Sequence, residues 1–457
     1  MRYDLLAEMQ TPQTPHWPTG IGGVPALLPD GTAVEIPVLQ GLNAITFGMV
    51  GTGKTQSFTL PAAELLLSAT PNMQAVFFEI KRTFIDRFRQ PGDKVITHNP
   101  AAVPAENLFR PCLIREIRQA KDQEAEMRQI AEFLFADLLD GANQNRGWVE
   151  AARNAFIGVF RVIVDCFPQE NTSNRQLVNG LRRMSAEELL AYLAKHPRNH
   201  SMMRKDFGCA PDNPAGYRPT RRTEDILFFF NQVLETFSGA FECDGEDTIQ
   251  DYLQGRYGRH LFFLYDLTSS ASSRPHMLYY LKKIKDYRMS SSAETAAPML
   301  LVMDEIDKLS EGGTAADFGL FQAANLGREC GLQLLVTTQS FENLFALAPD
   351  FNEHITRGGL AGFPMVLAFR PGDPPTIQTL QTLYGSGYRR HLVMPASRYE
   401  APAVKYELEP VVTDSDFASL DTGECYVKIM SCPPQRVRII HSQPKEAFNG
   451  SELPAVY

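Results

Sequence analysis

One eight-residue stretch constrains the fold of this chain more than any other feature. Residues 48–55 read Gly-Met-Val-Gly-Thr-Gly-Lys-Thr, and a short apolar segment, residues 43–47, precedes them. This spacing is typical of a phosphate-binding P-loop, in which backbone N–H groups surround a polyphosphate at a helix N-terminus. The alternative is a chance glycine-rich turn, which the full match in a strand–loop–helix context disfavours. The stretch therefore predicts a nucleotide-binding α/β fold.

Each residue type in this stretch has a distinct expected role. Glycines allow the backbone to turn sharply and to approach the phosphates closely. Lys54 would reach the β- and γ-phosphates, and Thr55 would hold Mg²⁺. We therefore expect ATP and Mg²⁺ as cofactors, with nucleotide-binding residues at Gly48, Gly51, Thr52, Gly53, Lys54 and Thr55.

A second motif closes the apolar segment at residues 298–305. Asp304 and Glu305 follow Pro-Met-Leu-Leu-Val-Met. Asp304 would hold Mg²⁺ through water, and Glu305 would orient and activate the attacking water. Such an acid pair marks ATP hydrolases in which another strand lies between this strand and the P-loop strand. The alternative is a strand that happens to end in solvated acids.

Two further residues are candidates for hydrolysis. Gln339 ends the apolar segment 331–340 and could report the nucleotide state, although this turn could instead be a helix cap made by Ser340 or Thr338. Arg328 follows the preceding helix and could complete the site of a neighbouring subunit. It could equally stabilise the C-terminus of its own helix. Arg357 is a second candidate for this role.

The order of apolar segments predicts the fold class and the domains. Apolar runs at residues 74–79, 260–266, 298–305, 331–340 and 364–369 indicate buried strands of a mostly parallel sheet. Apolar residues recur at spacings of three and four between 113 and 253, with a polar, basic loop near 196–205. We expect an N-terminal extended arm (1–40) with an edge strand at 34–38, a first nucleotide-binding part (41–112), an inserted all-α domain (113–254) and a second part with a C-terminal tail (255–457).

Smaller expectations concern individual segments. Pro61 should kink the helix that follows the P-loop. Glu79, which ends its strand, could position water or make an interdomain contact. A strand pair is expected at 425–429 and 436–440, and the tail from Leu392 is expected to be otherwise irregular.

Composition and charge limit the classes of partner. The formal net charge of −9 argues against a generally adhesive nucleic-acid binder but leaves room for a local basic surface. Seven scattered cysteines without a Cys-x-x-Cys pair predict reduced thiols. No apolar run reaches the length of a transmembrane helix. The basic residues that could contact DNA phosphates, or simply be solvated, are Arg198, Arg204, Lys205, Arg218, Arg221 and Arg222.

The order of these parts resembles the coupling proteins of type IV secretion, which are conjugative DNA pumps related to FtsK- and HerA-type translocases. The resemblance rests on residues 48–55, Glu79-Ile-Lys81, Val302-Met-Asp-Glu305, Gly327-Arg-Glu-Cys-Gly331 and Thr338-Gln-Ser340. The segments 237–241 and 247–253 also resemble the family's exit from its helical domain. The similarity covers roughly residues 20–430.

The resemblance implies a RecA-like P-loop NTPase with an inserted all-α domain. It implies ATP–Mg²⁺ binding by Lys54 and Thr55, hydrolysis driven by Asp304 and Glu305, a trans arginine finger at Arg328 and a sensor at Gln339. It also implies a homo-hexamer around DNA. The implied partners are a relaxase or other secretion substrates, components of the secretion channel and a membrane-anchored protein. The implied location is the cytoplasm, at the inner face of the membrane.

Three departures from the family pattern affect these expectations. Typical members carry an N-terminal membrane hairpin, for which the P-loop lies too near Met1; the chain is therefore a soluble member, or its anchor belongs to a partner or was removed. Glu79 stands where members commonly carry Asp. The net acidity requires that a few basic residues line any DNA pore.

Two other functions fit the same motifs. One is a HerA-like DNA motor in repair, defence or packaging. The other is a substrate receptor whose helical domain carries the function and whose ATPase is weak. We adopt the hypothesis of a coupling ATPase, which hydrolyses ATP to move DNA.

Overall fold

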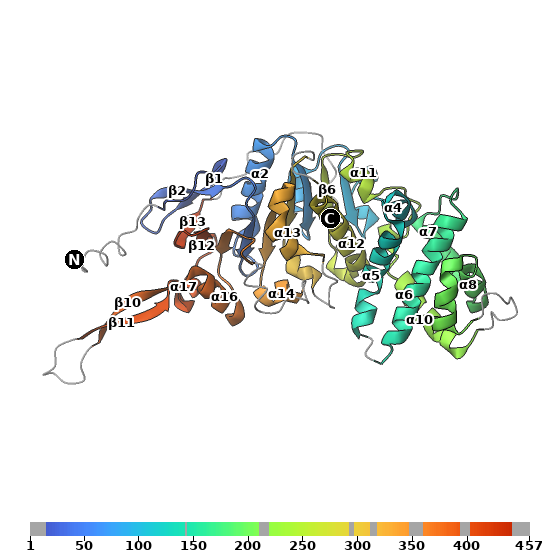
Figure 1. Ribbon diagram of the computed structural model, residues 1–457. Coiled ribbons are helices and arrows are strands. Elements are labelled where there is room, and N and C mark those ends of the chain that lie inside the picture. The colour runs from blue at the N-terminus through green and yellow to red at the C-terminus, as the bar shows by residue number, and fades with distance from the viewer. Residues whose placement is uncertain are drawn as a thin grey trace.

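The computed structural model describes residues 15–141, 144–209, 219–291, 297–310, 318–346, 360–393 and 403–440. The molecule is elongated, with a large central sheet, a block of helices at one end and a two-stranded ribbon at the other (Figure 1). The P-loop lies in the central part, which positions the candidate site.

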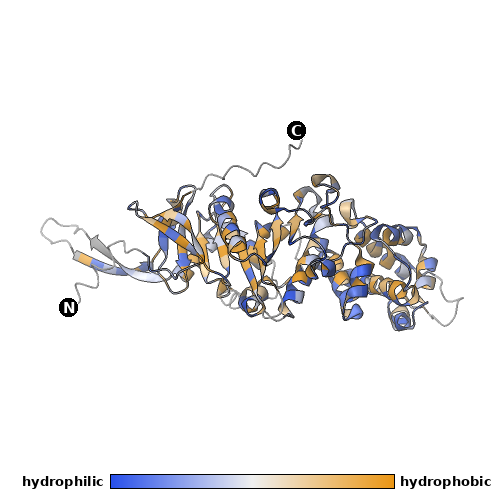
Figure 2. Cartoon of the chain, turned by 90° about the horizontal axis from the view of Figure 1, so that it is seen from above, coloured by the Kyte–Doolittle hydropathy of each residue, from blue (hydrophilic) through white to orange (hydrophobic). Residues whose placement is uncertain are grey.

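The parallel part of the central sheet contains every strand predicted to carry a site residue. Its order is β9-β3-β8-β7-β4-β6-β5, and all neighbours in this series are parallel. The strands are β3 (Ala44–Phe47), β4 (Gln74–Glu79), β5 (Lys94–Thr97), β6 (His260–Leu264), β7 (Met299–Met303), β8 (Leu332–Thr338) and β9 (Met365–Ala368). They are near-continuous apolar runs because helices cover both faces of the sheet (Figure 2). β8 lies between β3 and β7, so the predicted inserted strand is confirmed.

An antiparallel extension completes the eleven-stranded sheet. Its order is β2-β1-β13-β12, and β12 pairs with β9. The strands are β1 (Gly22–Leu27), β2 (Ala33–Val38), β12 (Glu424–Ile429) and β13 (Gln435–Ile439). The strand pair β12–β13 and the edge strand β2 agree with the predictions. The segment expected as an extended arm differs, because β1 joins β2 and β13 in the sheet and leaves β2 at its edge.

Alternate residues of each strand pack into two cores, one on each face of the sheet. Phe77 belongs to the core beneath α2 (Leu60–Ala69) and α3 (Thr83–Phe88), whereas Phe78 belongs to the opposite core. That second core also receives α12 (Ser270–Met289), α13 (Leu320–Leu326), α14 (Phe341–Ala346), α16 (Pro374–Tyr384) and α17 (Asp414–Ala418).

The helix after the P-loop is irregular just before Pro61. A π-helical turn, η1 (Thr55–Thr59), runs without a break into α2, in which Pro61 is the second residue. The kink predicted at Pro61 stays a prediction.

The described residues between Leu113 and Leu253 add no strand to the sheet. Serine residues cap two of their helices, since Ser173 and Ser185 each form a capping box. The loop expected near 196–205 is instead a series of helical turns. The elements are α4 (Leu113–Gln119), α5 (Gln123–Gly141), α6 (Arg146–Arg161), η3 (Val162–Cys166), α7 (Asn174–Arg183), α8 (Ala186–Leu193), η4 (Pro197–Asn199), α9 (His200–Met202), η5 (Met203–Phe207), α10 (Arg221–Leu234), η7 (Gly239–Phe241) and α11 (Ile249–Leu253).

These observations confirm the fold class, an α/β P-loop fold with a mostly parallel sheet and a helical insertion. The division into domains at residues 41, 113 and 255 stays a prediction. None of the helices that the structure describes combines the length and the apolar character that a membrane crossing requires.

A projecting ribbon replaces part of the tail that was expected to be irregular. β10 (Ser386–Val393) pairs antiparallel with β11 (Ala403–Pro410), and the pair forms a sheet of its own. Tyr388 lies opposite Leu408, and both side chains are exposed. The ribbon extends beyond α16 and α17, away from the helical block (Figure 1).

Candidate nucleotide site

The P-loop forms a cradle at the carboxyl edge of the parallel sheet. It follows β3, and its backbone is left-handed at Gly51 and Gly53, with φ values of 80° and 98°. A Cβ atom at Gly53 would lie 2.8 Å from the Ser57 hydroxyl. Thr52 braces the loop, because its hydroxyl donates to the Met49 carbonyl and its own carbonyl accepts the Gly423 N–H. Glycines are therefore needed here for the turn and for close packing.

Thr55 and Asp304 meet although 249 residues separate them in sequence. The Thr55 hydroxyl donates to Asp304 Oδ1 over 2.8 Å, and the Thr337 hydroxyl donates to the same oxygen over 2.6 Å. The Glu305 N–H in turn donates to Thr337 Oγ1 over 2.8 Å. These oxygens are hard ligands of the kind that Mg²⁺ prefers. The pair predicted to hold Mg²⁺ therefore converges, and Thr337, near the end of the intervening strand β8, fixes its geometry.

Lys54 and Glu305 lie on the same pocket with different partners. Lys54 Nζ donates to the Gly48 and Met49 carbonyls. Glu305 has a left-handed backbone, with φ of 51°, and its carboxylate pairs with Lys81 over 3.0 Å. A non-glycine residue in this region is uncommon and is found at functional sites. The pocket is lined by residues 49–56, Lys81, Thr83, Asp304 and Glu305.

Burial shifts the charge balance of this pocket. It lowers the pKa of Lys54, against the attraction of Glu305 and Asp304. It raises the pKa of Asp304, against the hydrogen bonds from Thr337 and Thr55. A charged ligand that replaces the lost solvent would stabilise the ionised form of each group. A polyphosphate with a divalent cation supplies such charges, so the residues fit ATP and Mg²⁺.

Gln339 lies beside the pocket without lining it. Its backbone N–H donates to Asp307 Oδ1 over 3.3 Å, while its buried Nε2 has no hydrogen-bond partner among the described residues. Asp307 Oδ2 is also buried and unpartnered there. Ser340 caps α14 by accepting the Asn343 N–H, so the alternative of a helix cap applies to Ser340. The amide of Gln339 remains available for a sensor role.

Arg328 lies far from the P-loop of its own chain. It belongs to η10 (Gly327–Cys330), which precedes β8, whereas the P-loop follows the carboxyl end of the parallel neighbour β3. β8 contains seven residues, so it separates the two by about 23 Å at ~3.3 Å per residue. The side chain is exposed. Arg328 can therefore act on a phosphate only in another copy of the chain. Arg357 lies outside the described residues.

Glu79 does not serve the pocket. Its carboxylate is fully buried and accepts the N–H groups of Phe84 and Ile85, over 2.8 and 2.7 Å, at the start of α3. Its role is therefore structural, since both carboxylate oxygens accept hydrogen bonds from a helix N-terminus. Burial raises the pKa of Glu79 to about 7, although these two hydrogen bonds oppose the shift.

We expect Glu79 to make folding stability depend on pH. Its pKa is raised from 4.5 to about 7, so the folded chain binds a proton more tightly than the unfolded chain does. Its contribution is fully present below pH about 4.5 and is lost as pH rises through about 7, by roughly 3 kcal/mol. Glu79→Gln should remove this component from urea unfolding measured between pH 5 and pH 8. Glu64→Gln, at the surface, is the control; equal pH slopes in all three proteins would contradict the assignment.

The predicted basic cluster divides in the structure. Arg198 and Lys205 line a cavity in the helical block. Arg222 stacks on Trp148, 5.0 Å from its ring centre. Arg204 has a partner of its own, and Arg221 begins α10. Arg218 lies outside the described residues.

Several residues of the site were not assigned by the sequence. Lys81 was noted after Glu79, but its pairing with Glu305 depends on the adjacency of β4 and β7. Thr337 lies near the end of a strand and Asp307 lies in a turn, and neither sequence context distinguishes them from residues without a role in the site. Gly423 supports the P-loop from a distant segment, and nothing local indicates this. Only the acid-x-Lys pattern of residues 79–81 offered a sequence signal.

Comparison with protein families gives one match that spans most of the chain. The model of the type IV secretion-system coupling protein DNA-binding domain matches residues 36–440. A search of curated proteins found no match.

Comparison with solved structures identifies similar folds. The unbound conjugative coupling protein TrwB, lacking its first 70 residues, aligns with a TM-score of 0.67 and 16% identity, covering 97% of this chain and 92% of that chain. The TrwB complex with ADP and Mg²⁺ aligns with a TM-score of 0.65 and 16% identity, covering 96% of this chain and 92% of that chain. VirB4 of Thermoanaerobacter pseudethanolicus aligns with a TM-score of 0.56 and 14% identity, covering 95% of this chain and 99% of that chain.

Proposed function

The chain belongs to the type IV secretion-system coupling protein family, and from this premise we propose that it is an ATP-driven motor that moves DNA toward a secretion channel. It is a P-loop ATPase of that family, with ATP and Mg²⁺ as its cofactors. The contact of 2.8 Å between Thr55 and Asp304 carries the proposal, because it joins the two motifs that together hold Mg²⁺. The TrwB complex with ADP and Mg²⁺ supports the same assignment.

Each residue of the pocket has a proposed role in hydrolysis. The P-loop N–H groups, with Gly48, Gly51, Thr52 and Gly53 shaping the loop, hold the phosphates. Lys54 leaves the Gly48 and Met49 carbonyls to reach them. Mg²⁺, held by Thr55 and Asp304, would neutralise phosphate charge. Glu305 leaves Lys81 and accepts a proton from water, and Gln339 senses the nucleotide state.

The position of Arg328 supports the proposal of an oligomer. This side chain is exposed at the edge of the sheet opposite the P-loop, so its proposed role requires a neighbouring subunit. A closed ring of identical subunits supplies each site with one such arginine. We propose a homo-hexamer with DNA at its centre, a relaxase or other secretion substrate as cargo, and a position at the inner face of the membrane through a membrane-anchored partner and channel components.

Turnover and imaging test this proposal together. ATP hydrolysis by the purified chain should rise when single- or double-stranded DNA is added, and negative-stain images with ATP and DNA should show rings. A chain that hydrolyses no ATP with either DNA and forms no ring would refute the motor. Ring formation without DNA-stimulated turnover would instead favour a docking protein.

We expect Arg328→Ala to reduce turnover by about 10³-fold or more while ATP binding persists, because the finger stabilises transition-state charge. Measurements are steady-state hydrolysis and equilibrium nucleotide binding. Arg146→Ala, which removes an exposed arginine on α6, is the control.

Mixing two inactive variants separates action in trans from action in cis. In a ring that contains Arg328→Ala and Lys54→Ala subunits, some sites combine an intact P-loop with an intact neighbouring arginine. Activity should therefore partly return on mixing. No recovery would contradict the shared site, and normal activity of Arg328→Ala alone would move the finger role to Arg357.

A further inference from the structure

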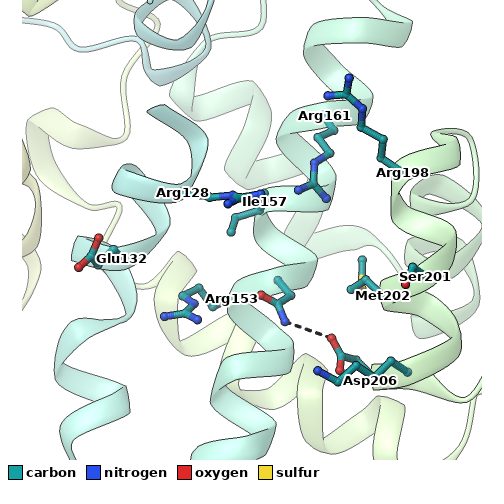
Figure 3. Close-up of a pocket in the computed structure, with 11 residues that line it drawn as sticks. Arg128, Glu132, Arg153, Ile157, Arg161, Arg198, Ser201, Met202 and Asp206 are labelled. Carbon is teal, nitrogen blue, oxygen red and sulfur yellow. Dashed lines mark hydrogen bonds between the residues drawn. The ribbon is translucent and has the colours of Figure 1, made fainter. Parts of the chain in front are cut away.

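A basic cavity lies in the helical block, apart from the nucleotide pocket. It has a volume of about 520 Å³ and is formed by α5, α6 and the helical turns 197–207 (Figure 3). This volume lies within the range of small-ligand sites. Its lining contains more cations than carboxylates: Arg128, Arg153, Arg161, Arg198 and Lys205 against Glu132 and Asp206. Such an excess is local, because the whole chain carries a net charge of −9.

Part of this charge is neutralised within the protein, which fixes two of the arginines. Glu124 accepts two hydrogen bonds from Arg161 and also pairs with Arg128. Arg161 lowers the pKa of Glu124 to about 2, so the carboxylate is ionised. Arg161 also donates to Asn199 Oδ1, which leaves two of its five N–H groups unused. Arg161 is thereby held as a preorganised donor on the cavity wall.

The remaining cations are free to meet a ligand. No hydrogen bond or ion pair joins the side chains of Arg153, Arg198 or Lys205 to any other residue that the structure describes. Asp206 is engaged, because it accepts from Asn154 over 3.1 Å, and Figure 3 shows this bond at the cavity. Ile157 and Met202 supply apolar surface beside these groups. Three cations on three elements, α6, η4 and η5, around an apolar patch match an anion with more than one charged group.

We propose that this cavity is a second anion site that binds a ligand with two or more phosphate groups. Guanidinium groups bind phosphate oxygens in pairs, and a lysine adds a point charge, so Arg153, Arg198 and Lys205 together suit adjacent phosphates. The ligand is either a free polyphosphate, such as a nucleotide, or successive phosphates of a DNA strand; the latter case rests on the proposed DNA motor. The site shares no residue with the P-loop pocket.

The binding test uses the full chain with Lys54→Ala, which weakens phosphate binding at the P-loop. Calorimetry measures the affinity for inorganic tripolyphosphate, and fluorescence anisotropy measures the affinity for a 20-nucleotide single strand of DNA. Each affinity is compared between the Lys54→Ala chain and the same chain that also carries Arg153→Ala and Lys205→Ala. We expect the added changes to weaken at least one ligand by about tenfold or more. Arg183→Ala removes an exposed arginine on α7, outside the cavity, and should have no such effect.

The two arms identify the source of the phosphate. Weaker tripolyphosphate binding with unchanged DNA binding assigns a free polyphosphate. Weaker DNA binding, with a salt slope smaller by roughly 1–2, assigns a strand. Unchanged binding of both ligands, or an equal loss in Arg183→Ala, overturns the site.

Two measurements separate the site from folding and from the motor. The side chains of Arg153, Lys205 and Arg183 are at least partly exposed, and unchanged thermal unfolding will confirm that the variants fold. The same cavity changes in a chain with intact Lys54 should preserve basal ATP hydrolysis without DNA. Absence of hydrolysis in the unsubstituted chain would refute the proposed motor while leaving the cavity test intact.

Discussion

Glu305→Gln should reduce ATP turnover by about 10²- to 10⁴-fold while ATP binding is retained, because an amide cannot accept the proton from water. The side chain is nearly isosteric, so the hydrogen bond from the Glu305 N–H to Thr337 should remain. The contact between Thr55 and Asp304 should also remain, since neither residue is altered. Measurements are single-turnover hydrolysis and equilibrium binding of ATP with Mg²⁺.

Two variants give this result its meaning. Lys54→Ala should lose both binding and turnover, because it removes the cation that contacts the phosphates. Glu342→Gln makes the same chemical change on α14, outside the pocket, and should leave turnover unchanged. If Glu305→Gln retained normal turnover, the water-activating role would be refuted, and the acid at 305 would be a partner of Lys81 alone.

Elements whose structure is determined by their own local sequence were predicted correctly. The parallel strands are apolar on both faces, so each could be found without its neighbours. The P-loop combines glycines, Lys54 and Thr55 within eight residues. The meeting of Thr55 with Asp304 was also predictable, because motifs at the carboxyl ends of parallel strands face the same edge.

Some features that depend on contacts between distant segments were not predicted from the sequence. Glu79 resembles a site residue, since it ends a buried strand, but the start of α3 occupies both of its oxygens. The ribbon β10–β11 was missed because its exposed pair, Tyr388 and Leu408, gives no alternation between a buried and a solvated face.

A buried charge cluster connects the helical block to the helices on the sheet. Lys283 on α12 lies 2.6 Å from Glu116 on α4 and 2.8 Å from Glu126 on α5. Glu116 is fully buried and also accepts the Ile249 N–H. Burial alone would lower the pKa of Lys283, but the attraction of the two carboxylates outweighs it and raises that pKa. Lys283 is therefore charged and is the common partner of both acids.

We expect Lys283→Met to destabilise the chain by about 3–5 kcal/mol, because it leaves the buried Glu116 without its cation. Urea unfolding followed by circular dichroism measures the loss. Lys282→Met is the matched control one residue earlier, where the partly exposed pair with Asp286 should contribute less than about 1 kcal/mol. Equal losses at the two positions would contradict the assignment.

Adding Glu116→Gln to Lys283→Met distinguishes charge from packing. The amide oxygen can still accept the Ile249 N–H, while the uncompensated charge disappears. Stability should therefore partly recover in the double variant. Without recovery, the loss in Lys283→Met would come from altered packing between α12 and the helical block. Recovery would instead show that the loss in Lys283→Met comes from the uncompensated charge on Glu116.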